Sequence, residues 1–190
     1  MSLEVVLGPM FAGKSSYILS YIRRYESIGW PVLCITSSLD TRYEEGAIHS
    51  HNHERHSAVS TATLLPIQKT DAYKEAKLIV IEEGQFFPDL LVFTQEALDT
   101  DKKDLLVVGL DGDAERRPFG QLLQIIPLCD KVMKLTAMCK PCSKQAIFTH
   151  RRSADTSVIK VGGQDEYEAL CRACYIKQIR AASFADDCDK

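Results

Sequence analysis

Residues 3 to 15 read LEVVLGPMFAGKS, an apolar run that passes directly into a glycine-rich turn. A short apolar run of this kind is typical of a strand that is buried on both faces of a parallel sheet. Residues 8 to 15 match the pattern G-x-x-x-x-G-K-[ST], and residues 15 to 28 carry apolar side chains at helical spacing. A strand, this turn and a helix in succession predict a phosphate-binding loop.

Each part of that loop has a physical task. Gly8 and Gly13 let the backbone curl so that successive N–H groups face inward, and the following helix brings a partial positive charge of about +0.5 to its N-terminus. Lys14 is expected to reach the β- and γ-phosphates, and the Ser15 hydroxyl to ligate Mg²⁺. The alternative is a chance glycine-lysine turn, and the flanking strand and helix argue against it.

Further apolar runs along the chain predict the rest of a sheet. Strands are expected at residues 31–36, 78–81, 105–110 and 132–135, and helices at 15–28, ended by Gly29, and at 88–100, started by Pro88. Short apolar strands separated by helices predict an α/β fold, a parallel sheet with helices on both faces. We expect a nucleotide-binding domain over residues 1–135, a small second module over 136–180 and a disordered tail over 181–190.

The composition excludes several classes of protein. The net charge is −3 over 190 residues and no basic run is present, so non-specific binding of nucleic acid through a basic surface is not expected. No apolar stretch is long enough to span a bilayer, and the N-terminus has no basic segment typical of a secretory signal. We therefore expect a cytoplasmic protein that acts away from membranes.

Two cysteine pairs mark the second module. Cys139 and Cys142 form C-K-P-C, and Cys171 and Cys174 form C-R-A-C. Two C-x-x-C pairs suit four thiolates around one structural, tetrahedral Zn²⁺, which would anchor both ends of the long segment between them. The alternatives are reduced structural cysteines or a redox C-x-x-C. Cys34 and Cys129 are interpreted as core residues, and Cys188 as a free thiol in the tail.

The order of the motifs resembles that of the type II (cytosolic) thymidine kinases over roughly residues 4 to 178. The shared motifs are GPMFAGKS, DTRY, EEGQFFPD, LDG with RPFG, LTAMCKPC and GGQDEYEALCRACY. The resemblance implies a RecA-like sheet and transfer of the γ-phosphate of ATP, with Mg²⁺, to the 5′-hydroxyl of thymidine, with deoxyuridine as a further acceptor, in pyrimidine deoxynucleotide salvage. It also implies a zinc-anchored "lasso" loop over the base, a homotetramer (or dimer) and feedback inhibition by dTTP.

The resemblance also implies roles for individual residues. Glu83 matches the catalytic base. The residues expected to bind ATP or its phosphates are Gly8, Pro9, Met10, Phe11, Ala12, Gly13, Lys14, Ser15, Asp40, Thr41, Arg42, Glu82 and Gln85. Those expected around the nucleoside are Phe86, Leu110, Phe119, Thr149, Val158, Ile159, Lys160, Val161, Gly162 and Tyr167. Ser15 and Glu82 would hold Mg²⁺, and Cys139, Cys142, Cys171 and Cys174 would hold Zn²⁺.

The sequence departs from the family pattern at three positions. Glu82 stands where many relatives have Asp, Ala114 where relatives often have a pocket Phe, and Lys160 where the lasso usually has an apolar residue. None of these changes removes a group that the chemistry requires. Because neighbours on a strand point to opposite sides, Glu82 and Glu83 are expected to have different roles, the first on Mg²⁺ and the second on the nucleoside.

The motifs allow two other interpretations. A P-loop NTPase switch with a structural zinc module would need a water-positioning residue, and the guanine motif N-K-x-D is absent from the sequence. A zinc-ribbon nucleic-acid binder conflicts with the acidic charge balance. Four histidines, His49, His51, His53 and His56, resemble a metal-binding tract, but we interpret them as a solvent-facing segment between strands, with His150 on the lasso surface.

Overall fold

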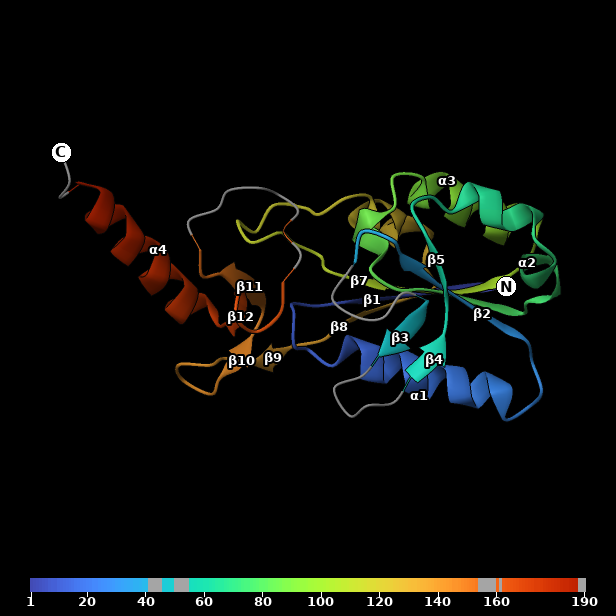
Figure 1. The fold of residues 1–190 in the computed structure, drawn as a ribbon, viewed down its shortest axis with the longest axis horizontal. Coiled ribbons are helices and arrows are strands. Elements are labelled where there is room, and N and C mark those ends of the chain that lie inside the picture. The colour runs from blue at the N-terminus through green and yellow to red at the C-terminus, as the bar shows by residue number, and fades with distance from the viewer. Residues whose placement is uncertain (41–45, 50–54, 154–159, 161, 188–190) are drawn as a thin grey trace.

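The computed structural model describes the chain except for residues 41–45, 50–54, 154–159, 161 and 188–190. Six parallel strands form the central sheet, in the order β5-β2-β6-β7-β1-β8 (Figure 1). Their bounds are β1 Ser2–Leu7, β2 Val32–Ser37, β5 Val59–Thr61, β6 Leu78–Ile81, β7 Asp104–Gly109 and β8 Lys131–Lys134. The expected α/β fold with a parallel sheet is confirmed.

Helices cover both faces of this sheet. Helix α1 (Lys14–Glu26) lies on one face, while α2 (Asp71–Glu75) and α3 (Leu90–Gln95) lie on the other (Figure 1). Strand β1 contributes side chains to the cores on both faces of the sheet, because its side chains alternate between the faces. Leu3 and Val5 pack into the cluster that includes α3, whereas Val6 packs with Ile18 and Ile22 of α1. The central strands are apolar on both faces because both faces are covered.

Several elements differ from the sequence-based expectation. The helix expected at 88–100 is α3 followed by a π-helical turn, η3 (Glu96–Thr100), and α1 ends at Glu26, before Gly29. Short 3₁₀ helices lie at η1 (Leu65–Lys69), η2 (Gly84–Phe86) and η4 (Leu122–Leu128). The parallel edge strand β5 and the hairpin of β3 (Ala47–His49) and β4 (Arg55–Ser57) were not predicted, because three-residue strands carry no readable periodicity.

Small antiparallel pairs follow the central sheet along the chain. Strand β9 (Ala137–Met138) pairs with β10 (Gln145–Ala146), and β11 (Phe148–Arg151) pairs with β12 (Tyr167–Leu170). They lie together at one end of the molecule, and α4 (Arg172–Asp187) extends outward from them (Figure 1). Residues 181–187 therefore continue a helix where a disordered tail was expected. The run RAASFA is rich in alanine, which has the highest helix propensity.

Candidate active site

The glycine-rich turn lies between β1 and α1 and borders a cavity of about 540 Å³, which is within the range of small-molecule sites. Gly13 caps the helix with φ of 79°, and α1 begins at Lys14. The Lys14 ammonium donates to the carbonyls of Gly8 and Pro9, at 3.2 and 2.9 Å. The predicted residues that line this cavity are Met10, Phe11, Ala12, Gly13, Lys14, Ser15, Asp40, Glu82, Glu83 and Gly162.

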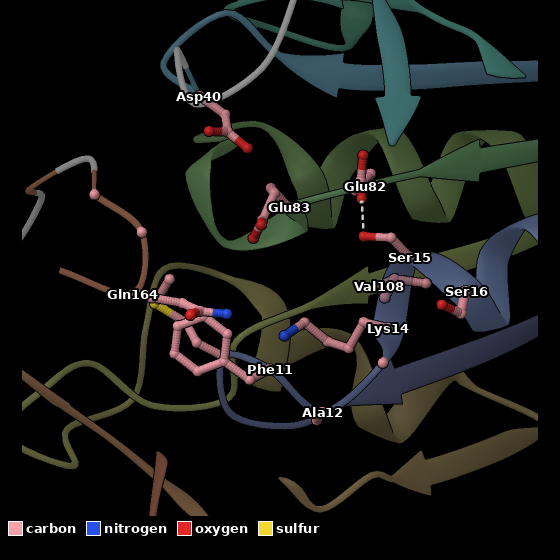
Figure 2. A pocket seen from close by; sticks show the side chains of 14 residues that line it. Phe11, Ala12, Lys14, Ser15, Ser16, Asp40, Glu82, Glu83, Val108 and Gln164 are labelled. Atoms are coloured by element: carbon pink, nitrogen blue, oxygen red, sulfur yellow. Dashed lines mark hydrogen bonds between the residues drawn. The ribbon is translucent and has the colours of Figure 1, made fainter. Parts of the chain in front are cut away.

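Glu82 reaches the start of α1. The Ser15 hydroxyl donates a hydrogen bond of 2.8 Å to Glu82 Oε1, which places a hydroxyl and a carboxylate together beside the helix N-terminus (Figure 2). Both are hard oxygen donors of the kind that Mg²⁺ prefers. The pair lies on the side of the cavity that faces β6 and α1, where the positive end of the α1 dipole favours negative charge.

Glu83 faces a different environment from Glu82. Strand β6 ends at Ile81, and Glu83 has a left-handed backbone conformation, with φ of 53° and ψ of 45°. The sequence predicts that alternation along a strand sends the two side chains to opposite sides. In the structure the strand has already ended, and a turn separates the two carboxylates. The Glu83 side chain is 7% exposed and points into the cavity from above the phosphate loop (Figure 2).

A second cavity adjoins the first, and Met10, Asp40, Glu83 and Gly162 line both. Phe86 and Phe119 meet edge to face in its wall, with ring centroids 5.6 Å apart. Other predicted residues that line it are Gln85, Leu110, Thr149, Lys160 and Tyr167. Ala114 lines it too, so the position where relatives often carry Phe does belong to this cavity.

Hydrogen bonds join the second module to the phosphate loop. The Thr149 hydroxyl on β11 accepts from the backbone N–H of Met10 at 3.0 Å. On β12, the Tyr167 hydroxyl donates to the carbonyl of Lys160 at 2.7 Å and accepts from the buried Arg151 guanidinium at 3.2 Å. The Lys160 ammonium pairs with Glu166 at 2.7 Å, so the lasso lysine has a polar partner. The first of these contacts joins β11 to the loop after β1, and the others tie Lys160 to the residues around β12.

The four predicted zinc-ligand cysteines converge. Their sulfur atoms all lie within 4.8 Å of one another, and Cys142 and Cys171 are 3.6 Å apart. Four thiolates at 2.3 Å from a tetrahedral Zn²⁺ would be about 3.8 Å from each other, so the arrangement fits a metal ion. The backbone N–H of Cys174 lowers the pKa of the Cys171 thiol to about 7, whereas burial raises the pKa of Cys139 and the hydrogen bond with Cys142 raises that of Cys174 to about 12. Cys171 is therefore the thiol of these three that ionises most readily.

Some predicted residues fall elsewhere. Thr41, Arg42, Val158, Ile159 and Val161 lie outside the described residues, as do His51, His53 and Cys188. Pro9 lines a separate cavity of about 220 Å³ with Asp113 and Phe148. His49 and His56 lie on the paired strands β3 and β4, and His56 contacts Glu26 of α1 at 3.0 Å. Among the described residues, the cysteine cluster is the only group of three or more His, Cys, Asp or Glu side chains that could hold a metal ion.

Sequence reasoning missed two charged residues in the second cavity. Arg151 is 7% exposed, and Asp113 is 6% exposed and accepts from the backbone N–H groups of Glu115 and Arg117. The run DGDAERRP is typical of a turn and could have indicated Asp113. The polar run THRRS contains no signal that distinguishes Arg151 from its neighbour Arg152.

No helix of the described chain is both long and apolar enough to cross a membrane.

Comparison with known proteins identifies the family. The family model "Thymidine kinase" matches residues 1–175. The chain is 39% identical to the thymidine kinase of raccoon poxvirus over 176 residues, covering 93% of this chain and 97% of that protein. It is 40% identical to thymidine kinase a of Arabidopsis thaliana (92% and 75% covered) and 36% identical to the cytosolic thymidine kinase of Homo sapiens (93% and 74% covered). The chain therefore belongs to the thymidine kinase family.

Proposed function

We propose that the protein transfers the γ-phosphate of ATP to the 5′-hydroxyl of thymidine to give thymidine monophosphate. One observation carries this proposal, namely that Glu83 lies where the two cavities meet. The first cavity presents a phosphate loop and Lys14, and the second presents an aromatic pair suited to a flat base. A carboxylate at the junction is where an acceptor hydroxyl would approach a terminal phosphate.

The groups present suit phosphoryl transfer, which depends on positioning and charge neutralisation. The N–H groups of residues 8 to 15 and the Lys14 ammonium would hold the phosphates. The Glu83 carboxylate would accept the proton of the 5′-hydroxyl as that oxygen attacks the γ-phosphorus. The leaving ADP would remain in the phosphate cavity. Phe86 and Phe119, which contact each other edge to face, would together form one apolar wall beside the thymine ring, with Leu110 and Tyr167 completing its surroundings.

Ser15 and Glu82 fit a magnesium ion that accompanies ATP. Their oxygens are already 2.8 Å apart at the N-terminus of α1, and both are hard donors. When bound there, Mg²⁺ would neutralise charge on the β- and γ-phosphates. Asp40, which lines both cavities, would lie beside the phosphates, and Thr41 and Arg42 remain proposed phosphate contacts from the resemblance alone.

The cysteine cluster supports a structural Zn²⁺ rather than a catalytic one. All four ligand positions would be protein thiolates, so none remains open for substrate. The ion would tie β9 and the start of α4 together and so fix the ends of the segment that carries Lys160 and Gly162. We accordingly propose residues 136–180 as a zinc-anchored substrate-binding module on a nucleotide-binding domain of residues 1–135.

Further properties are proposed from family membership. We expect a cytoplasmic enzyme of pyrimidine deoxynucleotide salvage, a homotetramer or dimer in solution, and inhibition by dTTP. Deoxyuridine is expected as a second acceptor because it differs from thymidine by one methyl group. Light scattering measures the assembly directly, and the 21.3 kDa chain gives the unit of mass.

A coupled assay of ADP release tests the proposed function. With ATP, Mg²⁺ and each of the four deoxynucleosides in turn, ADP is expected to form with thymidine and to match the thymidine monophosphate produced. Equal ADP release without nucleoside would instead favour a P-loop NTPase switch. The Lys14→Ala variant is expected to remain folded and to lose turnover, since it deletes the charge beside the transferred phosphate.

A further inference from the structure

Gln85 makes contacts that phosphate binding does not explain. Its side chain is 3% exposed, and its amide nitrogen donates a hydrogen bond of 2.6 Å to Glu83 Oε2. Its amide oxygen accepts a hydrogen bond of 3.0 Å from the backbone N–H of Leu110, which follows β7. Gln85 therefore joins the proposed base to a wall of the nucleoside cavity. We infer that Gln85 is a positioning residue, which holds the Glu83 carboxylate in line with the acceptor hydroxyl. This inference rests on the proposed function.

The chemistry of both partners requires an amide at this position. An ionised carboxylate only accepts hydrogen bonds, and a backbone N–H only donates them. Glutamine is the uncharged side chain of this length that supplies one donor and one acceptor. A glutamate at position 85 would set a second carboxylate against Glu83, and a methionine would match neither partner. The bond to a charged group is also the stronger kind of hydrogen bond.

Glu83 needs such a support because of its backbone. The residue follows the last residues of β6 in a left-handed conformation and leads into the 3₁₀ turn η2. Its carbonyl accepts from the N–H of Phe86 at 3.0 Å, which closes the turn but does not orient the carboxylate. A side chain on a single turn has several staggered rotamers available. The hydrogen bond from Gln85 selects one of them.

The surroundings leave Gln85 little freedom to move away. A Cβ atom at Gly109 would come within 2.3 Å of the Gln85 amide oxygen. A Cβ atom at Gly120 would come within 2.0 Å of the Gln85 carbonyl oxygen. Any side chain at either glycine would therefore displace Gln85 from its place. This close fit from two separate segments pre-organises the amide, and thereby the carboxylate that it contacts.

The test compares Gln85→Met with Gln121→Met. Both glutamines accept from a backbone N–H through the amide oxygen, since Gln121 accepts from Leu91 at 2.8 Å, but only Gln85 also contacts Glu83. For Gln85→Met we expect kcat to fall about 10- to 100-fold and KM for thymidine to stay within about threefold. Gln121→Met should leave kcat within about twofold. An unchanged kcat in Gln85→Met, or a raised KM alone, would overturn the inference.

A double-mutant cycle separates positioning from general destabilisation. If Gln85 acts through Glu83, adding Gln85→Met to Glu83→Gln should lower the residual kcat by less than about twofold. A full further loss in that background would overturn the inference. Should Gln85→Met fail to fold, Gln85→Glu keeps the shape of the side chain and cannot donate when ionised. That variant is then expected to lose kcat, and its full activity would equally overturn the inference.

Failure of the inference can be told apart from failure of the proposed function. A wild-type protein that forms no thymidine monophosphate would defeat the function itself. A wild-type protein that is active, with Glu83→Gln inactive and Gln85→Met fully active, would defeat only the role of Gln85.

Discussion

At the scale of single residues, the adjacent carboxylates of Glu82 and Glu83 have different hydrogen-bond partners. Glu82 accepts from the Ser15 hydroxyl beside the phosphate loop, whereas Glu83 is turned into the junction of the two cavities and receives the Gln85 amide. The sequence EEGQ predicts different roles for the two, on the argument that neighbours on a strand point to opposite sides. In the structure β6 ends before both residues, and the left-handed turn at Glu83 separates their side chains.

This arrangement predicts an asymmetry between two substitutions. Glu83→Gln should lower kcat by about 10²- to 10⁴-fold, because the amide cannot accept the proton of the acceptor hydroxyl. Thymidine should still bind, which equilibrium dialysis can measure. Glu82→Asp should be mild, since it keeps a carboxylate near Ser15. A harmless first change with a severe second one would show that the two roles are reversed.

The buried thiol of Cys34 should make the free energy of unfolding depend on pH only in the alkaline range. Burial, with smaller contributions from the charges of Glu82 and Glu26, raises its pKa from 9.0 to about 12. The folded state therefore keeps a proton that the unfolded state releases above pH 9, so this stabilisation is complete below pH 9 and is lost as the pH rises toward 12. Urea unfolding from pH 8 to 11 should show a shallower loss of stability in Cys34→Ala than in the wild type. Equal slopes would contradict the assignment.

At the scale of elements, long apolar runs were predictable and short or irregular pieces were not. The strand expected at residues 78–81 is β6, and the other expected strands differ from the structure by about one residue at their ends. Strands β3, β4 and β5 have three residues each and form only because another strand pairs with them, β3 with β4 and β5 with β2. The π-helical turn after α3 likewise leaves no mark in the apolar spacing.

Asp89 links two of these elements and should contribute measurably to stability. Its carboxylate accepts from the backbone N–H groups of Leu64 and Leu65, at 2.8 and 2.9 Å, and so ties the start of η1 to the start of α3. Asp89→Ala should lower the free energy of unfolding by about 1–3 kcal/mol, because it leaves these donors without their acceptor. Asp89→Asn keeps one acceptor oxygen and should cost less. Denaturant unfolding of the two variants measures the difference, and equal losses would contradict this account.

At the scale of the whole molecule, the second module should depend on its metal. Its buried cluster is small and consists of Ala137, Cys139, Ala146, Ala169, Leu170, Cys171 and Tyr175. A core of this size is expected to need additional stabilisation. Structural Zn²⁺ contributes on the order of 10 kcal/mol to the folding free energy of small domains.

Metal analysis of gently purified protein should therefore find about one zinc per chain, and a chelator should lower both the melting temperature and the affinity for thymidine. Cys142→Ser should lose the zinc, while Cys129→Ser, which alters a cysteine outside the cluster, should retain it. Less than half an equivalent of zinc in the wild type would count against the site.

The glycine-lysine motif, the strands, the cysteine pairs and the family resemblance could all be predicted from the sequence, because each depends on residue types at short or fixed spacing. Which groups meet depends instead on how distant segments pack together. Strand order β5-β2-β6-β7-β1-β8 brings the ends of β1 and β6 to one edge, and the pairing of β11 with β12 carries Thr149, Arg151 and Tyr167 to the second cavity. The contact between Gln85 and Glu83 is close in sequence, yet it depends on a left-handed turn and on two distant glycines that leave room for it. These contacts arise because segments far apart in the chain pack closely together, so the local sequence pattern does not predict them.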